Sequence, residues 1–366
     1  MMKTYQPEAF VSLALTHGRT LCEEGAFWMN WSLSGLTLRF RGRELRASLR
    51  ALSEQLPGPA GAPPSPIDWP CLGVAEDGQL IRRLKVDQEE GEYLLYQGDE
   101  KEHEIRLVKL SENARGKLGI LALFTDGELM ACVEETKQGH IEFIGDSITC
   151  GFGNEAKDRD DPFETSEENA WIAYGALAGR ELGMETDLIS VSGISCGQPL
   201  KPMFPMDSMD ELYPYQDRLF QRKLGVPEKP YDFAAHPKEI IILNLGTNDV
   251  NPVRFNPDFE QAALEEQHFG ANYRTFLEQI RKLNGPDALI GCVLGPLDYY
   301  LYDVLKETVE AYIRETGDKK VFCYKFIGVN LMSEGFGAVG HPSAKTHQRM
   351  ARELAGVILR EMNQRK

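Results

Sequence analysis

The chain has 366 residues, of which 42% are hydrophobic and 26% charged, so it is long enough to bury a sizeable core and to form two domains. This composition excludes disordered chains, collagen and disulfide-stapled miniproteins. The formal net charge of -16, from 40 Lys and Arg against 56 Asp and Glu, opposes binding to phosphate backbones or anionic lipid. Nucleic acid and membranes are therefore not expected partners.

The amino terminus carries no pattern typical of export. It has one early lysine, Lys3, a short apolar stretch that Thr16 and His17 interrupt, and no small-residue cleavage site. No segment of the sequence reaches the roughly eighteen apolar residues of a membrane-spanning helix. We therefore expect a cytoplasmic protein.

The seven cysteines are an odd number without a Cys-x-x-C pair, which is typical of a reducing compartment and of small buried side chains. The seven histidines are scattered and do not stand at ligand spacing from a second His, Cys or carboxylate on one helical face. We expect neither a disulfide framework nor a metal site.

The first third of the chain alternates apolar and polar residues over short runs. Residues 36–41 and 104–110 show this period of two, which predicts strands with one exposed face. Three turn signals that contain both glycine and aspartate separate such runs, at 76–78, 97–99 and 125–127. A long proline-rich loop is expected at 57–66. The pattern predicts an all-β sandwich or jelly roll over residues 1–135.

After residue 140, apolar runs alternate with longer helical stretches. Five runs are expected to be strands: 141–144, 186–191, 239–245, 288–294 and 320–326. Four stretches between and after them are expected to be helices: 167–182, 273–283, 300–316 and 343–362. This alternation predicts a parallel five-stranded sheet covered by helices, an α/β domain over residues 136–366. Ligands of such sheets bind beyond the carboxyl ends of the strands, so the residues that follow each strand are the candidates for chemistry.

Residues that suit acyl transfer follow these strands. Ser147 stands at the end of the first strand, Gly193 follows the second and Asn248 the third, while His341 lies on a loop before the last helix. Each of them alone has an ordinary explanation as a turn, a helix cap or a solvated side chain. Together they supply a nucleophile, a base and three N–H donors for an oxyanion.

Four sequence blocks resemble those of the SGNH (GDSL) hydrolase superfamily, in the same order: Gly145-Asp146-Ser147-Ile148-Thr149, Gly193, Gly246-Thr247-Asn248-Asp249 and His341-Pro342-Ser343. The resemblance runs from about residue 141 to the carboxyl terminus and implies a flavodoxin-like catalytic domain. With the sandwich-like first domain, the chain resembles more narrowly carbohydrate esterase family 2, which couples a jelly roll to an SGNH domain and removes acetyl groups from xylan and related sugars. This narrower resemblance rests on domain order, on the strand that leads into Ser147 and on Tyr213-Pro214-Tyr215.

The resemblance implies a role for each residue of the site. Ser147 would be the nucleophile and His341 the general base and then the general acid. The backbone N–H groups of Ser147 and Gly193 and the side-chain Nδ2 of Asn248 would form the oxyanion hole. The reaction would pass through an acetyl-Ser147 intermediate and would need no cofactor.

Aromatic residues are the candidates for substrate contact. Tyr213 or Tyr215 could stack on a sugar ring, and the alternative is that they pack a long loop onto the sheet. Trp28, Trp31 and Trp69 could form a carbohydrate platform in the first domain, although core burial is the expected fate of at least two of them.

One position departs from the superfamily pattern. The Asp that usually stands three residues before the histidine is replaced by Ala338. Some members of carbohydrate esterase family 2 are similar in working as a Ser–His dyad, in which a main-chain carbonyl orients the imidazole. A carbonyl between Gly335 and Val339 could serve here, and Glu334 is the rival orienter. We favour the carbonyl, which still selects the tautomer but gives the imidazolium less electrostatic support.

The sequence therefore predicts a carbohydrate O-deacetylase, similar to acetyl xylan esterases, that acts on acetylated xylo-oligosaccharides or related sugars. Two alternatives stay open. One is an SGNH lipase or thioesterase for longer acyl chains. The other is a carbohydrate-binding protein that has lost catalysis, which the alanine at position 338 would explain. The sequence leaves open which sugar and hydroxyl carry the acetyl group, whether the chain forms a homo-oligomer, and whether the first domain binds substrate.

Overall fold

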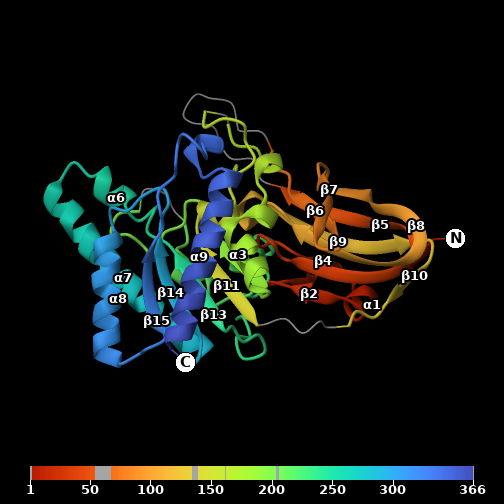
Figure 1. Cartoon of the computed structure of the whole chain (residues 1–366). Helices are drawn as coiled ribbons and strands as arrows, with labels where there is room; N and C mark the ends of the chain where they lie inside the picture. The colour runs from red at the N-terminus through yellow and green to blue at the C-terminus, as the bar shows by residue number, and fades with distance from the viewer. Residues whose placement is uncertain (1, 54–66, 134–138, 161, 203–205, 366) are drawn as a thin grey trace.

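The computed structural model describes residues 2–53, 67–133, 139–160, 162–202 and 206–365. Within these residues the chain forms an antiparallel β domain and an α/β domain, which lie side by side in Figure 1. The predicted two-domain architecture is therefore confirmed. The proline-rich loop at 57–66 and the predicted boundary between residues 135 and 136 lie outside the described residues.

The first domain contains short amino-terminal elements followed by long strands. Its elements are β1 (Lys3–Tyr5), α1 (Pro7–Val11), β2 (Leu15–His17), β3 (Leu21–Glu23), β4 (Ala26–Trp28), β5 (Gly35–Ser53), β6 (Cys71–Glu76), β7 (Gln79–Lys85), β8 (Glu90–Lys109), the 3-10 turn η1 (Asn113–Arg115), β9 (Gly116–Thr125) and β10 (Glu128–Met130). The strand order is β3-β4-β9-β5-β8-β6-β7, with β1 beside β9, and with β2 and β10 beside β5.

Strand β5 changes its neighbouring strands along its length. Its first part pairs with β2 and β10 and its second part with β9, while β8 follows it along most of its length. The change of neighbours coincides with a register shift between Gly42 and Glu44. Buried side chains from both parts of β5, such as Phe40 and Leu49, belong to one core. The domain therefore closes around alternating inward-facing residues, as the period of two predicts.

Two of the three predicted turns are confirmed. Asp77 and Gly78, both with positive φ, form the two-residue hairpin between β6 and β7, and residues 126–127 separate β9 from β10. The third prediction is wrong, because residues 97–99 lie inside β8. The register passes from Gly42 opposite Lys101 to Glu44 opposite Gln97, so the extra residues form a bulge instead of a turn.

The α/β domain contains a parallel sheet with the strand order β12-β11-β13-β14-β15. The strands are β11 (His140–Gly145), β12 (Glu185–Ser190), β13 (Ile240–Asn244), β14 (Leu289–Leu294) and β15 (Val321–Lys325). All five predicted strands are confirmed to within one residue at each end. The carboxyl ends of β11, β12 and β13 therefore meet at one edge of the sheet.

Helices and 3-10 turns connect these strands. They are α2 (Ser147–Cys150), η2 (Thr165–Glu167), η3 (Ala170–Ile172), α3 (Tyr174–Leu182), α4 (Met209–Leu212), α5 (Arg218–Leu224), α6 (Asn251–Arg254), α7 (Phe259–Asn284), α8 (Tyr302–Thr316), η4 (Ala338–Gly340) and α9 (Ala344–Gln364). Helix α3 begins later than predicted, because Ala173 before it is extended. Helix α7 begins earlier, because Asp258 caps it by accepting the N–H groups of Glu260 and Gln261. Among the described residues no helix is long and apolar enough to cross a bilayer.

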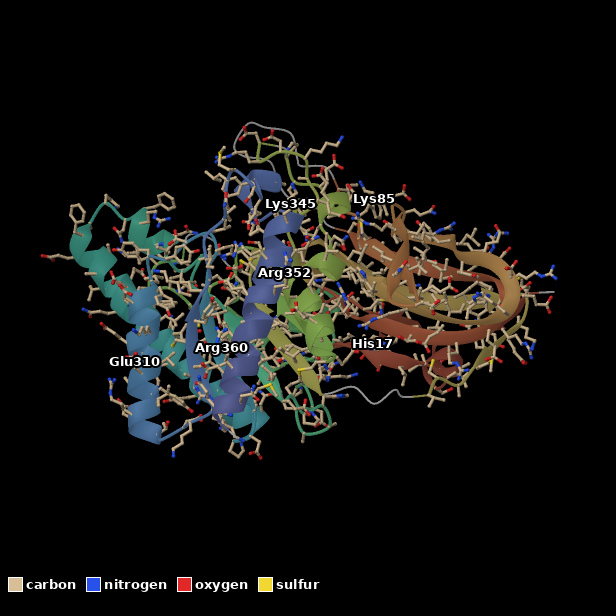
Figure 2. All side chains as sticks on the ribbon, viewed as in Figure 1. His17, Lys85, Glu310, Lys345, Arg352 and Arg360 are labelled. Carbon is tan, nitrogen blue, oxygen red and sulfur yellow. The ribbon has the colours of Figure 1, made fainter. Side chains whose placement is uncertain are left out.

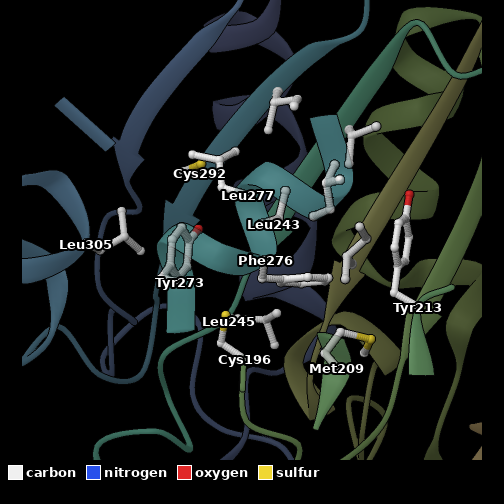
Figure 3. Close-up of a cluster of buried hydrophobic side chains, with 14 of the residues drawn as sticks. Cys196, Met209, Tyr213, Leu243, Leu245, Tyr273, Phe276, Leu277, Cys292 and Leu305 are labelled. Carbon is white, nitrogen blue, oxygen red and sulfur yellow. The ribbon is translucent and has the colours of Figure 1, made fainter. Parts of the chain in front are cut away.

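The helices cover the two faces of the parallel sheet. Along β13, Ile242 packs on one face with α3 and α9, and Leu243 packs on the other with α7 and α8. Figure 3 shows part of the cluster on this second face, which includes Leu243, Phe276 and Leu305. Charged residues of α9 such as Arg360 are exposed and lie on the outside of the molecule in Figure 2. Each long helix is thus amphipathic and buries one stripe.

A buried arginine joins the two domains. Arg19 has no exposed surface, and its Nη1 donates to the carbonyl oxygens of Tyr213 and Tyr215 at 2.5 and 2.8 Å. Its Nη2 forms an ion pair with Glu142 of β11 at 3.4 Å, and its guanidinium lies 4.1 Å from the ring centroid of Tyr231. One side chain from the first domain therefore satisfies three acceptors of the second, so the two domains form one packed unit.

We expect Arg19→Ala to destabilise the protein by about 3–5 kcal/mol, because it leaves the Glu142 carboxylate buried without its cation. Arg19→Lys should not restore the loss, since one ammonium cannot reproduce the planar fork of donors. Arg43→Ala is the matched control, because the Arg43–Glu100 pair is exposed and contributes about 0–1 kcal/mol. Denaturant unfolding measures all three variants, and equal losses for Arg19→Ala and Arg43→Ala would contradict this account.

Candidate active site

A tight turn at the end of β11 presents Ser147. A Cβ atom on Gly145, the last residue of the strand, would collide with the Thr149 hydroxyl, so the turn requires glycine. The Asp146 side chain caps α2 by accepting the N–H of Ile148 at 2.9 Å. Burial raises the pKa of Asp146 to about 7. Ser147 is thus the first residue of a short helix and keeps a small exposed fraction of 8% at the sheet edge.

The structure brings His341 against Ser147. Nε2 of His341 lies 2.9 Å from Oγ of Ser147, across a separation of 194 residues in the sequence. Nδ1 lies 3.2 Å from the carbonyl oxygen of Ala338, which also accepts the backbone N–H of His341 at 3.0 Å. The imidazole ring packs against Phe152, with 4.4 Å between ring centroids. A main-chain carbonyl therefore occupies the position from which it selects the tautomer with the proton on Nδ1.

The packing of Ala338 explains why no aspartate stands there. Ala338 has no exposed surface, and its N–H donates to the carbonyl of Gly153 at 3.0 Å. A Cβ atom added to Gly153 would collide with Cβ of Ala338, so the two backbones are in close contact. The following residue, Val339, has φ of 51°, an unusual conformation for a β-branched residue. This turn directs the Ala338 carbonyl toward His341 and leaves no room for a carboxylate at position 338.

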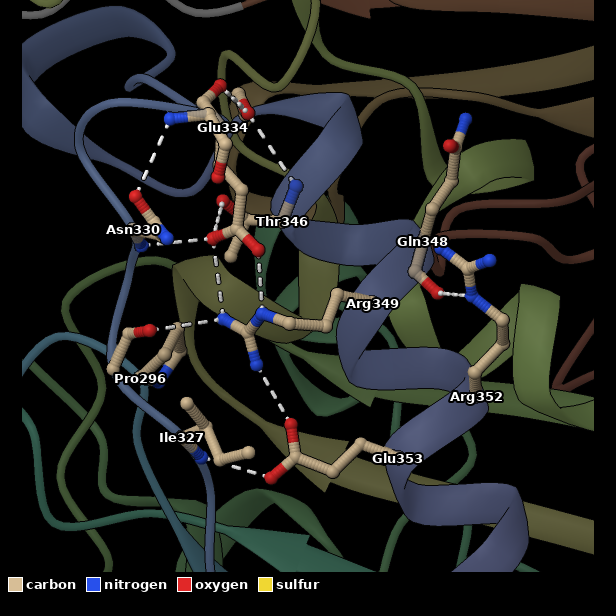
Figure 4. Close-up of polar contacts among 12 residues, drawn as sticks. Pro296, Ile327, Asn330, Glu334, Thr346, Gln348, Arg349, Arg352 and Glu353 are labelled. Carbon is tan, nitrogen blue, oxygen red and sulfur yellow. Dashed lines mark hydrogen bonds and ion pairs between the residues drawn. The ribbon is translucent and has the colours of Figure 1, made fainter.

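Glu334 does not contact the imidazole, so the rival prediction for the orienter is wrong. Its carboxylate binds Nε of Arg349 at 2.6 Å and accepts from the Asn330 N–H and the Thr346 hydroxyl at 2.9 and 3.2 Å, as Figure 4 shows. These partners hold the pKa of Glu334 below its usual value. Glu334 is therefore an ionised anchor that ties the loop before His341 to helix α9.

The other predicted residues lie on the two neighbouring loops. Gly193, after β12, has φ of 81°, and of the atoms in the described part of the chain only Met206 Sδ, at 3.9 Å, comes near the position of a Cβ there. Nδ2 of Asn248, after β13, donates to the carbonyl of Ile194 at 3.0 Å and lies 3.4 Å from Oδ2 of Asp146. Asn248 therefore connects the turn that carries Ser147 with the loop that carries Gly193.

Burial sets the protonation state of His341. Desolvation lowers the pKa of the imidazole below its ordinary value of 6.5, and the Ala338 carbonyl and the charge of Glu112 partly oppose this. The ring is therefore neutral near pH 7. A neutral ring with its proton on Nδ1 can accept the Ser147 hydroxyl proton at Nε2.

The two predicted sugar-stacking tyrosines lie elsewhere. Tyr213 has no exposed surface, and its hydroxyl donates to Oε2 of Glu142 at 2.7 Å, within the cluster of Figure 3. It cannot stack on a sugar, and the prediction is wrong because this loop packs onto the sheet. Tyr215 is half-buried with the Arg218 guanidinium 4.9 Å from its ring centroid, and its carbonyl binds Arg19 at the domain interface.

The tryptophans of the first domain are also largely structural. Trp28 and Trp31 are 0% and 1% exposed, and Trp28 packs on Phe220 with 4.6 Å between ring centroids. Trp69 is half-buried against the core of the β domain. At least two of the three are therefore excluded from a carbohydrate platform.

Three buried side chains near the site have donor atoms close enough for a metal ion. Glu112, Cys150 and Glu168 place one donor each within 4.8 Å of one another. Oε2 of Glu112, however, accepts the backbone N–H of Ser192 at 2.7 Å, and Oε2 of Glu168 accepts the N–H of Glu112 at 3.0 Å. Burial raises the pKa of Cys150 and Glu168 well above their usual values, which favours protonated groups that do not ligate. These groups are thus engaged within the protein.

Sequence reasoning missed Phe152 and Glu112. Phe152 lies in Gly151-Phe152-Gly153, five residues after Ser147, where an aromatic residue beside the nucleophile block could have indicated contact with the base. Glu112 belongs to the other domain and has no local sequence signal for a role at this site.

Two family models match the chain. Residues 143–349 match the GDSL-like lipase/acylhydrolase family, and residues 16–132 match the carbohydrate esterase 2 N-terminal domain. The chain belongs to the GDSL-like lipase/acylhydrolase family. The predicted resemblance to SGNH hydrolases and to carbohydrate esterase family 2 is confirmed, and with it the class of serine ester hydrolase.

Curated relatives agree with this assignment. The chain is 29% identical over 341 residues to a cellulase/esterase of Acetivibrio thermocellus, covering 90% of this chain and 37% of that protein. It is 26% identical over 272 residues to an acetylxylan esterase / glucomannan deacetylase of Cellvibrio japonicus, covering 72% of this chain and 70% of the relative. The chain thus spans little more than a third of the cellulase/esterase.

Solved structures share the fold over nearly the whole chain. A family two carbohydrate esterase from Clostridium thermocellum, in complex with cellohexaose, is 27% identical with a TM-score of 0.78, covering 96% of this chain and 99% of that chain. An acetyl xylan esterase from the rumen bacterium Butyrivibrio proteoclasticus is 23% identical with a TM-score of 0.84, covering 99% of each chain. Both domains are therefore part of the shared fold.

Glu334→Gln tests the orienter directly. If the Ala338 carbonyl orients His341, this variant keeps ester hydrolysis within about fivefold of wild type, whereas amide replacement of a true orienting carboxylate costs about 10⁴-fold. The variant should lose stability, because Arg349 loses a partially buried anion. Hydrolysis of p-nitrophenyl acetate and thermal unfolding measure the two effects, and a loss of activity near the larger figure would restore Glu334 as the orienter.

Proposed function

We propose that this chain is a carbohydrate O-deacetylase that hydrolyses acetyl esters of xylo-oligosaccharides or related sugars. The observation that carries the proposal is the alignment of Ser147 Oγ, the His341 imidazole and the Ala338 carbonyl at the carboxyl edge of the parallel sheet. The printed names of the curated relatives, which include acetylxylan esterases / glucomannan deacetylases, favour acetylated plant polysaccharides as the substrate class.

The geometry supports a two-step acyl transfer. Neutral His341 takes the hydroxyl proton of Ser147 as Oγ attacks the acetyl carbonyl carbon. The backbone N–H groups of Ser147 and Gly193 would stabilise the tetrahedral oxyanion, and Nδ2 of Asn248 would join them by releasing Ile194 or Asp146. The imidazolium then gives its proton to the sugar oxygen, which leaves as a hydroxyl and breaks the C–O bond. Water, deprotonated by the same imidazole, attacks acetyl-Ser147 and releases acetate.

An open surface cavity is lined by segments that precede and follow His341 in the sequence, although neither His341 nor Ser147 lines it. Its volume is about 640 Å³, and it lies between the 154–159 loop, residues 334–336 and the start of α9. This volume is in the range of sites for small ligands. Phe336 lines it and offers an apolar face.

The alternative of a catalytically inactive sugar-binding protein loses its main reason. That hypothesis depended on the missing aspartate at position 338. The carbonyl of Ala338 stands at Nδ1 of His341, so the imidazole has an orienting acceptor without that side chain.

Acetate release from acetylated xylo-oligosaccharides tests the proposal. Ser147→Ala and His341→Ala should each lower kcat/KM by roughly a thousandfold or more, because they remove the nucleophile and the base. Wild type should prefer p-nitrophenyl acetate over the octanoate. Release of no acetate above the Ser147→Ala background would contradict the proposal, and faster cleavage of octanoate would favour a lipase or thioesterase.

The pH dependence of kcat/KM follows from the His341 environment. The neutral imidazole is the active form, so activity is lost as the pH falls through the His341 pKa. Because burial lowers that pKa, the midpoint of the acid limb should lie below 6.5. Initial rates with p-nitrophenyl acetate in constant ionic strength buffers give the midpoint, and a value above 6.5 would be inconsistent with the buried neutral ring.

A further inference from the structure

One connection of the first domain reaches the catalytic residues of the second. It joins β8 to β9 and contains Glu112, which has no exposed surface, and the turn η1. The N–H of Ala170 in the α/β domain donates to the carbonyl of Leu110 at 2.9 Å. Buried Lys109 donates from Nζ to the carbonyl of Glu112 at 2.7 Å. The backbone around Glu112 is therefore fixed against the catalytic domain.

The Glu112 side chain ends at the oxyanion loop. Its Oε2 accepts the backbone N–H of Ser192 at 2.7 Å, and Ser192 directly precedes Gly193, the predicted oxyanion donor. A carboxylate that accepts a backbone N–H makes a strong, short hydrogen bond. This hydrogen bond holds the Val191–Ser192 peptide, which directly precedes the peptide that carries the Gly193 N–H. Gly193 itself has positive φ. Within the described residues, the direction of the Gly193 N–H thus depends on a side chain from the other domain.

The same connection also reaches the base. Arg115 forms an ion pair with Oε1 of Glu112 at 3.4 Å, and its guanidinium lies 4.9 Å from the ring centroid of Phe163. Phe163 stacks on Phe152 at 3.8 Å, and Phe152 packs against His341. Glu112 and Arg115 therefore support the oxyanion loop and the imidazole from one anchored segment.

The charges around His341 give Glu112 a second effect. The carboxylate of Glu112 raises the pKa of His341 against the desolvation that lowers it. His347 on α9 is buried, and its pKa of about 3 leaves it neutral. Ser147 on α2 is uncharged, and Arg115 lies beyond Phe152 with the opposite charge. Glu112 thus supplies part of the negative potential that the absent aspartate at position 338 would have supplied.

We propose that Glu112 is a positioning residue of the esterase site, contributed by the amino-terminal domain. It holds the Val191–Ser192 peptide, and through it positions the adjoining peptide whose Gly193 N–H faces the oxyanion. It also places a negative charge near the imidazolium that forms during the reaction. The proposal rests on the proposed function, since an oxyanion and an imidazolium arise only in acyl transfer. It makes the β domain a part of the active site.

Two substitutions separate the two effects. Glu112→Gln keeps the shape and an acceptor oxygen for the Ser192 N–H but removes the charge, so the acid limb of kcat/KM should move to lower pH with a small loss in kcat. Glu112→Ala also removes the acceptor, and kcat should fall about 10- to 100-fold, less than the 10²–10³ that follows loss of an oxyanion donor itself. KM should change little in both, because the substrate ground state does not depend on this hydrogen bond.

Glu142→Gln is the matched control. It removes the charge of another buried carboxylate at the domain interface, bonded to Tyr213 and Arg19 instead of the oxyanion loop. This variant should lower the unfolding midpoint but leave kcat and the acid limb unchanged. A purely structural role for Glu112 predicts the same pattern for both positions.

The outcomes distinguish the proposal from the function on which it rests. The proposal would be overturned if folded Glu112→Gln keeps the wild-type kcat and an unshifted acid limb and Glu112→Ala also keeps the wild-type kcat. That result would leave the esterase function intact. If Glu112→Ala does not fold, the isosteric Glu112→Gln decides through its pH profile. If wild type releases no acetate above the Ser147→Ala background, the proposed function fails and the proposal with it.

Discussion

The active site depends on the hydrogen bond between Nδ1 of His341 and the carbonyl oxygen of Ala338. A carbonyl cannot reorient without moving its peptide, so the whole turn around it must be rigid. Close packing of Ala338 on Gly153 and the anchoring of Glu334 to Arg349 provide that rigidity. The positive φ of Val339 is the strained element that these contacts maintain.

A neutral carbonyl orients the imidazole but supports its positive form less than a carboxylate does. Among the described residues, a carboxylate whose charge acts on His341 comes from the other domain, at Glu112. This placement requires the two domains to keep a fixed position relative to each other, and buried polar groups such as Arg19, which pairs with Glu142 of β11, help to hold it. The interface is therefore part of the chemistry as well as of the stability.

Much of the α/β domain could be predicted because its determinants are local. Short apolar runs ending in glycine or polar residues define the parallel strands, and strand ends at one sheet edge bring Ser147, Gly193 and Asn248 into neighbouring loops. Predictions failed where a distant partner decides the outcome. Tyr213 is an aromatic residue of the kind that stacks on sugars, but its hydroxyl donates a hydrogen bond to Glu142 on β11. Residues 97–99 have the composition of a turn, but pairing with β5 keeps them in a strand.

Glu112 shows the limit of such predictions most clearly. It follows a strand and precedes a short turn, a context in which a glutamate is ordinarily solvated. Its contact with Ser192 spans 80 residues and two domains, so no period or spacing in the sequence encodes it. Burial also changes its neighbours, lowering the pKa of Lys109 to about 7 and raising that of Glu168 well above its usual value.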